Sequence, residues 1–252
     1  MPCRVLVLLP SHDFDPTEAA VPSLALADAG HQVTFSTPQG QQAKGDPIMV
    51  TNKGLWLLAG VLPADKNGKK AYQRLLSLPS FQRPVPWSSL DASPYDALLL
   101  PGGHAKGGMR QYLESEKLQA VTAHFFDHKP VAAICHGVVL AARSVSSKTG
   151  KSVLHGLRTT SLLSFQEKLA WWLTWWWLGN YYRTYPDRTV ESEDKDALAR
   201  PNKDFLPGPM ALGRDTPDNL QSGFTVKDGQ YLSARWPGDV HRFTCDFLAM
   251  LQ

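Results

Sequence analysis

Short apolar runs that end at turn-forming residues recur along the chain, and they constrain its fold more than any other feature. The runs Cys3–Leu9, Ala97–Leu100 and Val131–Ile134 show no alternation of polar and apolar residues. Such runs are typical of parallel strands, because helices cover both faces of a parallel sheet. A predicted helix, Thr17–Ala29, separates the first run from a strand at Gln32–Ser36, so the chain opens as a β-loop-α-β unit. The sequence therefore predicts an α/β fold with a mostly parallel central sheet.

Weaker patterns place the remaining elements. Further helices are predicted at Lys69–Leu78, Glu114–Asp127, Val138–Ser144, Glu167–Leu178 and Asp239–Leu251. A weak strand is predicted at Ile48–Val50, and strands at Gly223–Val226 and Tyr231–Ala234 flank Asp228-Gly229, which favours a hairpin. Thr17 is the expected cap of the first helix. No linker divides the chain, so we expect one domain over residues 1–252, with insertions near 41–95 and 165–215.

Composition and charge exclude several classes of protein. Hydrophobic residues make up 43% of the 252 residues and the formal net charge is +3, which argues against disorder and against a nucleic-acid partner. No apolar stretch approaches the roughly 20 residues of a membrane helix, and the N-terminus does not resemble a secretory signal. The three cysteines, Cys3, Cys135 and Cys245, are too widely spaced for a disulfide framework or a zinc site. We therefore expect a cytoplasmic protein that binds no metal.

Cys135 is the strongest candidate for a reactive residue. It follows the strand Val131–Ile134 directly and precedes His136, Gly137 and a helix. Open α/β folds place their sites at this carboxyl edge, and a helix N-terminus directs N–H groups at the sulfur, which lowers the pKa of a thiol. The alternative is a buried core cysteine, but a core role needs neither the strand-end position nor the His-Gly pair.

Several motifs in order resemble the ThiJ/PfpI superfamily of class I glutamine amidotransferase-like proteins. They are AICHG after an apolar strand, PGGH (101–104) after YDALLL, a glutamate in the first βα loop, and GFTVKDGQYLSA near the end. The resemblance implies a flavodoxin-like three-layer sandwich with Cys135 as nucleophile. It places Glu18 beside the sulfur, as a protonated carboxyl that hydrogen-bonds the thiolate.

The resemblance also implies further site residues. Backbone N–H groups of Gly103 and His136 are the expected oxyanion donors, with Gly102 and His104 beside them. In branches with a Cys-His-acid triad, His136 is the histidine and Glu167 is the best match for the acid. The residues alone also allow simpler interpretations. Glu18 and Glu167 could be exposed helix residues, His104 could be a surface histidine, and PGG could be a plain turn.

The chain departs from the family pattern in two places. The late histidine, His241, has no glutamate two residues on, which argues against glutaminase chemistry. The segment WWLTWWWLGNYYRTYPD (171–187) lies outside the common core. A helix that is apolar on several sides is buried or meets a partner. We expect a lid or wall over the Cys135 pocket or a contact in a homodimer, with core packing as the alternative.

The leading functional hypothesis is a cysteine-dependent enzyme that needs no cofactor and acts on a small carbonyl compound. A glyoxalase III-like reaction would convert a 2-oxoaldehyde to a 2-hydroxy acid, with His136 or Glu18 moving the proton. Hydrolysis or hydration of another small electrophile, such as an amide or isonitrile, is a second enzymatic option. The rival from another class is a redox sensor or holdase chaperone in which Cys135 is oxidised.

Overall fold

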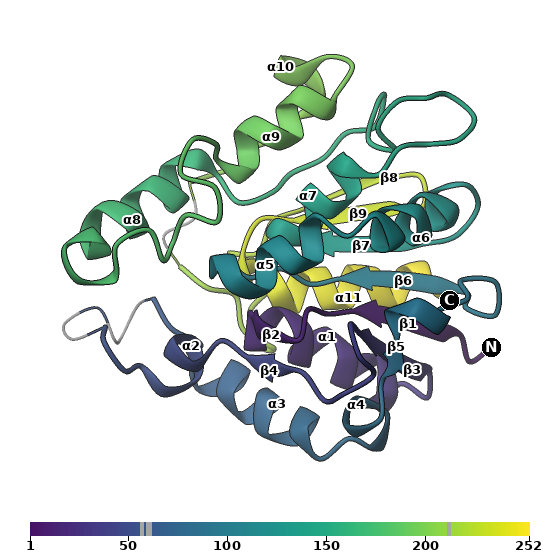
Figure 1. Ribbon diagram of the computed structural model, residues 1–252, viewed down its shortest axis with the longest axis horizontal. Coiled ribbons are helices and arrows are strands. Elements are labelled where there is room, and N and C mark those ends of the chain that lie inside the picture. Colours follow the sequence, from purple (N-terminus) through teal and green to yellow (C-terminus); the bar gives the residue numbers. More distant parts are fainter. Residues whose placement is uncertain (56–57, 59–61, 211–212) are drawn as a thin grey trace.

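A central sheet organises the computed structural model, which describes residues 1–55, 58, 62–210 and 213–252. Within these residues the sheet has seven strands in the order β5-β3-β1-β6-β7-β9-β8 (Figure 1). All neighbouring pairs are parallel except β8–β9, so the predicted mostly parallel sheet and its late hairpin are confirmed. The strands are β1 (Arg4–Leu8), β3 (Gln32–Thr37), β5 (Val85–Pro86), β6 (Ala97–Leu100), β7 (Val131–Ile134), β8 (Thr225–Asp228) and β9 (Tyr231–Ala234).

Helices cover both faces of this sheet and give the predicted three-layer, flavodoxin-like sandwich (Figure 1). On one face α1 (Pro16–Asp28) packs against α11 (Val240–Met250) and α3 (Lys66–Leu76). On the other face lie α5 (Lys106–Leu113), α6 (Glu116–Phe126) and α7 (His136–Arg143). All four residues of β6 and of β7 are fully buried, which explains why these strands are uniformly apolar.

The six predicted helices begin one or more residues away from the observed starts, and capping explains two of these differences. The cap of α1 is Asp15, whose carboxylate accepts the N–H groups of Thr17 and Glu18, so the assignment of Thr17 as cap was wrong. The predicted helix Glu114–Asp127 is only the second of two helices, because α5 ends at Leu113 and the Ser115 side chain caps α6. Polar residues next to a helix start compete for the capping role, and only the backbone geometry selects among them.

The segment 41–95 contains short elements rather than one unit. They are β4 (Lys44–Gly45), which pairs with β2 (His12–Phe14), then α2 (Pro47–Thr51), α3, α4 (Pro79–Gln82), β5 and the 3₁₀ turn η2 (Trp87–Ser89). The strand predicted at Ile48–Val50 is wrong. Asp46 caps a helix there and Pro47 occupies its first turn, and this local chemistry outweighs the β-propensity of three apolar residues.

The segment 165–215 contains most of a second group of helices, which lies beyond α7 (Figure 1). Its members are α8 (Ser164–Leu178), α9 (Val190–Ala197) and α10 (Pro201–Asp204), and α9 packs against α7. That this segment and 41–95 are insertions stays a prediction.

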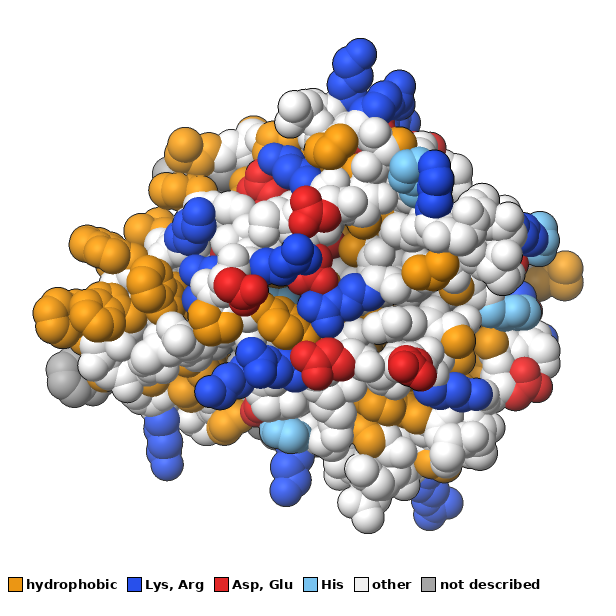
Figure 2. Space-filling model, turned by 45° about the horizontal axis from the view of Figure 1, so that its top comes forward, with side chains coloured by type: hydrophobic (Ala, Val, Ile, Leu, Met, Phe, Trp, Pro, Cys, Tyr) orange, Lys and Arg blue, Asp and Glu red, His pale blue; other side chains and the backbone are white. Residues whose placement is uncertain are grey.

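Helix α8 carries the tryptophan-rich sequence, and most of its tryptophans face outward. Trp172 and Trp176 are 64% and 77% exposed, and hydrophobic side chains gather over this helix at the left of Figure 2. The alternative of core packing is therefore wrong for them, whereas a contact between two copies stays a prediction. No helix among the described residues is both long and apolar enough to cross a bilayer.

Candidate functional site

The candidate nucleophile, Cys135, occupies a sharp turn between β7 and α7. Its φ of 56° and ψ of −126° lie in a region that residues other than glycine rarely adopt. Glycines on either side make the turn possible: a Cβ on Gly137 would lie 2.0 Å from the Leu100 carbonyl oxygen, and one on Gly102 would lie 2.6 Å from the His136 nitrogen. The backbone of the turn after β7 thus packs directly against the backbone at the end of β6 and in the loop that follows it. A nucleophile elbow has the same close packing.

The His136 imidazole lies beside the sulfur in a defined tautomer. Its Nδ1 is 3.5 Å from Cys135 Sγ, and its Nε2 is 3.0 Å from Thr184 Oγ1. The Thr184 hydroxyl donates its one proton to the His104 carbonyl at 2.7 Å. It must therefore accept from Nε2–H, which leaves the Nδ1 lone pair facing the sulfur. Burial lowers the pKa of His136 to about 3, so the imidazole is neutral.

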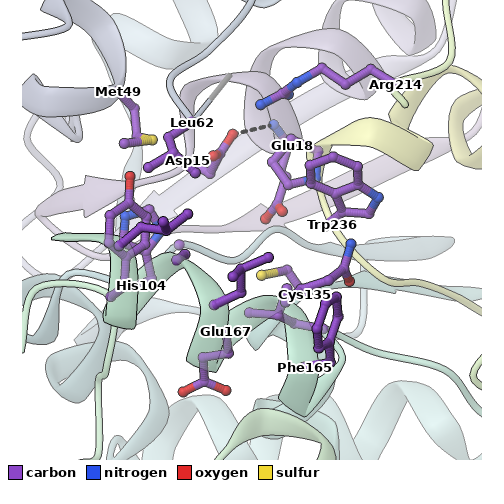
Figure 3. Close-up of a pocket in the computed structure, with 18 residues that line it drawn as sticks. Asp15, Glu18, Met49, Leu62, His104, Cys135, Phe165, Glu167, Arg214 and Trp236 are labelled. Carbon is purple, nitrogen blue, oxygen red and sulfur yellow. Dashed lines mark hydrogen bonds between the residues drawn. The ribbon is translucent and has the colours of Figure 1, made fainter. Parts of the chain in front are cut away.

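Glu18 reaches the sulfur from the first turn of α1. Asp15 fixes that turn: its carboxylate caps the helix and its N–H donates to the Gly102 carbonyl at 2.8 Å. Glu18 Oε2 accepts the Gly102 N–H at 2.9 Å, whereas the buried Oε1 makes no hydrogen bond. In Figure 3 the Glu18 carboxyl and the Cys135 sulfur point toward one another, as the sequence predicted.

The acidities of Cys135 and Glu18 depend on one another. Burial and the carboxylates of Glu18 and Asp15 raise the pKa of the Cys135 thiol, so the expectation that this pKa is lowered overall is wrong. The His136 N–H bonds the sulfur and lowers the thiol pKa, but burial outweighs it. Burial, followed by the charge of Asp15, also raises the pKa of Glu18. Two buried neighbouring acids do not both ionise, so the thiolate forms with Glu18 protonated.

A pocket with a volume of about 210 Å³ opens above these groups. Cys135, Glu18 and Gly103 line its floor, together with His104. His104 is stacked on Tyr182 with 4.5 Å between ring centroids, and burial lowers the pKa of its imidazole to about 4. The structure thus brings four of the predicted site residues together at the carboxyl edge of the sheet, where open α/β folds bind ligands.

The backbone N–H groups near the sulfur do not all have the partners expected for oxyanion donors. The Gly102 N–H is occupied by Glu18, and the His136 N–H is directed at the sulfur. Gly103 lines the pocket and remains the predicted oxyanion donor.

Glu167 lies at the edge of the pocket, but its carboxyl faces away from Cys135 (Figure 3). It accepts the Val190 N–H at 2.9 Å and lies 3.2 Å from Arg183 Nε. Burial raises the pKa of Glu167 to about 7. The His136 ring nitrogens contact Thr184 and Cys135, so an orienting role for Glu167 stays a prediction without a hydrogen bond to support it.

Sequence reasoning missed four residues of the site. Asp15 had a signal, because Asp-Pro-Thr-Glu is a typical helix start with the cap first. Trp236 follows β9 closely and could have been found by the rule that selected Cys135. Thr184 and Arg214 lie in irregular segments where no pattern marked them; Arg214 lines the pocket, with its guanidinium 5.2 Å from the Trp236 ring centroid.

Comparisons with known proteins agree with this geometry. A family model described as ThiJ/PfpI family-like matches residues 9–209. Deglycase PfpI of Pyrococcus furiosus is 24% identical over 247 residues, which are 98% of this chain and 99% of that protein. A deglycase of Thermococcus kodakarensis is 38% identical over 71 residues, 27% of this chain and 41% of that protein.

The fold is shared with solved structures as well. Glyoxalase III from Candida albicans has a TM-score of 0.67 at 18% identity, with 98% of this chain and 97% of that chain covered. The family resemblance read from the AICHG and PGGH motifs is therefore confirmed, and the chain belongs to the ThiJ/PfpI-like family.

Proposed function

We propose that the protein is a cysteine-dependent enzyme that acts on a small carbonyl compound without a cofactor. The observation that carries the proposal is the arrangement around the sulfur: Cys135 in a strained turn, a buried carboxyl at one side and a neutral imidazole of fixed tautomer at the other. A merely structural cysteine needs neither neighbour. Thiol chemistry of this kind requires a reduced sulfur, which fits a cytoplasmic location.

The first step is addition of the thiol to an aldehyde. The thiol proton moves to the Glu18 carboxylate, so one negative charge moves from oxygen to sulfur and no new charge is buried. Transfer to His136 would instead create a cation where burial disfavours it, since the imidazole pKa is about 3. Sulfur then bonds the aldehyde carbon, and its oxygen takes the proton from Glu18 to give a hemithioacetal.

The second step moves a proton between neighbouring carbons, as in a glyoxalase III-like reaction. The Nδ1 lone pair of His136 lies beside the sulfur and accepts the hydrogen of the carbon bonded to it. The cation then faces the negative enediolate, which offsets the effect of burial. Return of this proton to the adjacent carbon, while the hydroxyl proton on the sulfur-bearing carbon passes to the neighbouring oxygen, yields a thioester of a 2-hydroxy acid. Water cleaves the C–S bond, and the acid and the thiol are released.

The similar proteins support an enzymatic role. Two relatives are deglycases, and one solved structure of similar fold is glyoxalase III from Candida albicans.

The decisive experiment measures loss of methylglyoxal and related 2-oxoaldehydes by the purified protein, without added metal or thiol. We expect turnover that Cys135→Ala abolishes, because no other group in the pocket can form the carbon–sulfur bond. Cys245→Ala is the matched control, since this exposed cysteine lies on α11 outside the pocket. Equal rates for the wild type and Cys135→Ala would contradict the proposal and favour an oxidation sensor.

A further inference from the structure

The pocket extends well beyond the reacting groups, and its extension is apolar. Apart from its polar residues, which include Gln166, Glu167 and Arg214 as well as those near Cys135, the lining is mostly aliphatic and aromatic. This apolar part is hereafter called the α8 wall, after the helix that supplies Phe165, Leu169 and Leu173. It also includes three residues outside that helix, Met49, Leu62 and Leu162. Figure 3 shows Phe165 near Cys135, with Leu62 and Met49 across the opening.

The size of the pocket exceeds what a small aldehyde needs. Roughly 10–15 Å³ of such space holds one water molecule, so the cavity of about 210 Å³ admits a ligand of roughly ten or more non-hydrogen atoms. Methylglyoxal, with about five such atoms, would leave much of the α8 wall in contact with water or empty space. An apolar surface of this kind is stabilised when an apolar group covers it.

The α8 wall also has an unusual exposure pattern. Phe165 and Leu169 line the pocket and yet are 56% and 38% exposed, so they stand at its mouth. Elsewhere on the same helix Thr174 is fully buried and bonds the Ala170 carbonyl. Two large apolar side chains of α8 thus stand partly in solvent at the mouth of the pocket, where a bound apolar group would cover them.

We propose that the substrate is a 2-oxoaldehyde whose ketone carbon, next to the aldehyde that Cys135 attacks, carries a bulky apolar group, aryl or branched alkyl. This inference rests on the proposed carbonyl chemistry and specifies its substrate class. The carbonyl binds at the polar floor between Cys135 and Gly103, and the apolar group lies against the α8 wall. Covering the ring of an aryl substrate is expected to raise kcat/KM by roughly 10- to 100-fold over methylglyoxal.

The test compares initial rates with phenylglyoxal and methylglyoxal, with intact-mass spectra confirming that no arginine adduct has formed. The wild type should prefer phenylglyoxal by at least tenfold in kcat/KM. Leu173→Ala should shift that preference toward methylglyoxal. Trp176→Ala is the matched control, because Trp176 lies on the same helix, faces solvent and does not line the pocket. Equal kcat/KM values for the two aldehydes, or an equal shift in both variants, would overturn the inference.

A binding measurement separates this inference from the proposed reaction. Acetophenone has the aryl group and a ketone but no aldehyde, and acetone is its small counterpart. Calorimetry with Cys135→Ala should show acetophenone binding at least tenfold tighter than acetone. If neither aldehyde is consumed but acetophenone still binds more tightly, the reaction is wrong and the apolar site stands. If the two ketones bind equally, the apolar site is wrong, whatever the enzyme turns over.

Discussion

The floor and the α8 wall of the pocket are built in opposite ways. On and just beneath the floor, Cys135, Glu18 and the neighbouring His136 are at most 4% exposed and project from helix starts at the sheet edge. On the wall, Phe165 and Leu169 stand partly in solvent on a helix outside the sandwich. Rigid placement suits groups that exchange protons, because small displacements cost large factors in rate. If the two proposals above hold, the difference teaches that reaction and selectivity are carried by separate parts of the chain.

The largest expected effect is the loss of activity when a reacting group on the floor, Glu18, is replaced. Glu18→Gln should lower kcat by roughly 10²–10⁴, because a glutamine cannot take the thiol proton. Steady-state kinetics on the preferred aldehyde measures it. Asp28→Asn, at the exposed end of the same helix, is the control and should leave kcat unchanged. A loss below threefold for Glu18→Gln would move the role of first base to His136.

Thr184 links the two regions, since it follows α8 in the chain and contacts His136 on the floor. Thr184→Val removes the acceptor for Nε2–H, so the imidazole can take the wrong tautomer. We expect kcat to fall about tenfold, the equivalent of one hydrogen bond, with little change in KM. Thr184→Ser should restore the rate. Failure of the serine variant to do so would show that Thr184 acts through packing instead.

The floor should also store backbone strain that the α8 wall lacks. A glycine adopts the φ of Cys135 freely, so Cys135→Gly should be more stable than Cys135→Ala by about 1 kcal/mol. Urea unfolding of the two inactive variants measures the difference. Equal stabilities would mean that the turn costs nothing and that the strain does not mark the site.

The smallest expected effect concerns Glu167, a residue of α8 at the edge of the pocket. Its folded-state pKa of about 7 is raised above the ordinary 4.5, so the stability it contributes is present below pH 4.5 and lost as the pH rises through about 7. The Tm of the wild type relative to Glu167→Gln should therefore be lower at pH 8 than at pH 4. A pH-independent Tm difference would contradict the raised pKa. A large fall in kcat for this variant would support the predicted orienting role.

The order of the motifs was sufficient to predict the sandwich and the position of Cys135 at the end of β7. The predicted range of β7 agrees with the observed strand, and the elbow after it contains Cys135 and His136 as expected. Neighbouring residues in one strand–turn–helix unit leave little freedom, because the backbone geometry follows from sequence-local hydrogen bonds and glycines. Local hydrogen bonds also explain why the strand predicted at Ile48–Val50 was wrong. The Asp46 cap and Pro47, which start a helix there, were overlooked.

What the sequence by itself determined is therefore the turn that carries the candidate nucleophile and the sheet beneath it, both fixed by contacts between near neighbours and by the burial of apolar strands. Only the tertiary structure decided the direction of the thiol pKa, the tautomer of His136 and the apolar lining of the pocket. Each of these depends on groups distant along the chain: Glu18 beside Cys135, Thr184 beside His136, and α8 over the floor. The pKa of a group depends on all the atoms that bury it and on all the charges near it. The order of residues along the chain does not show which atoms those are.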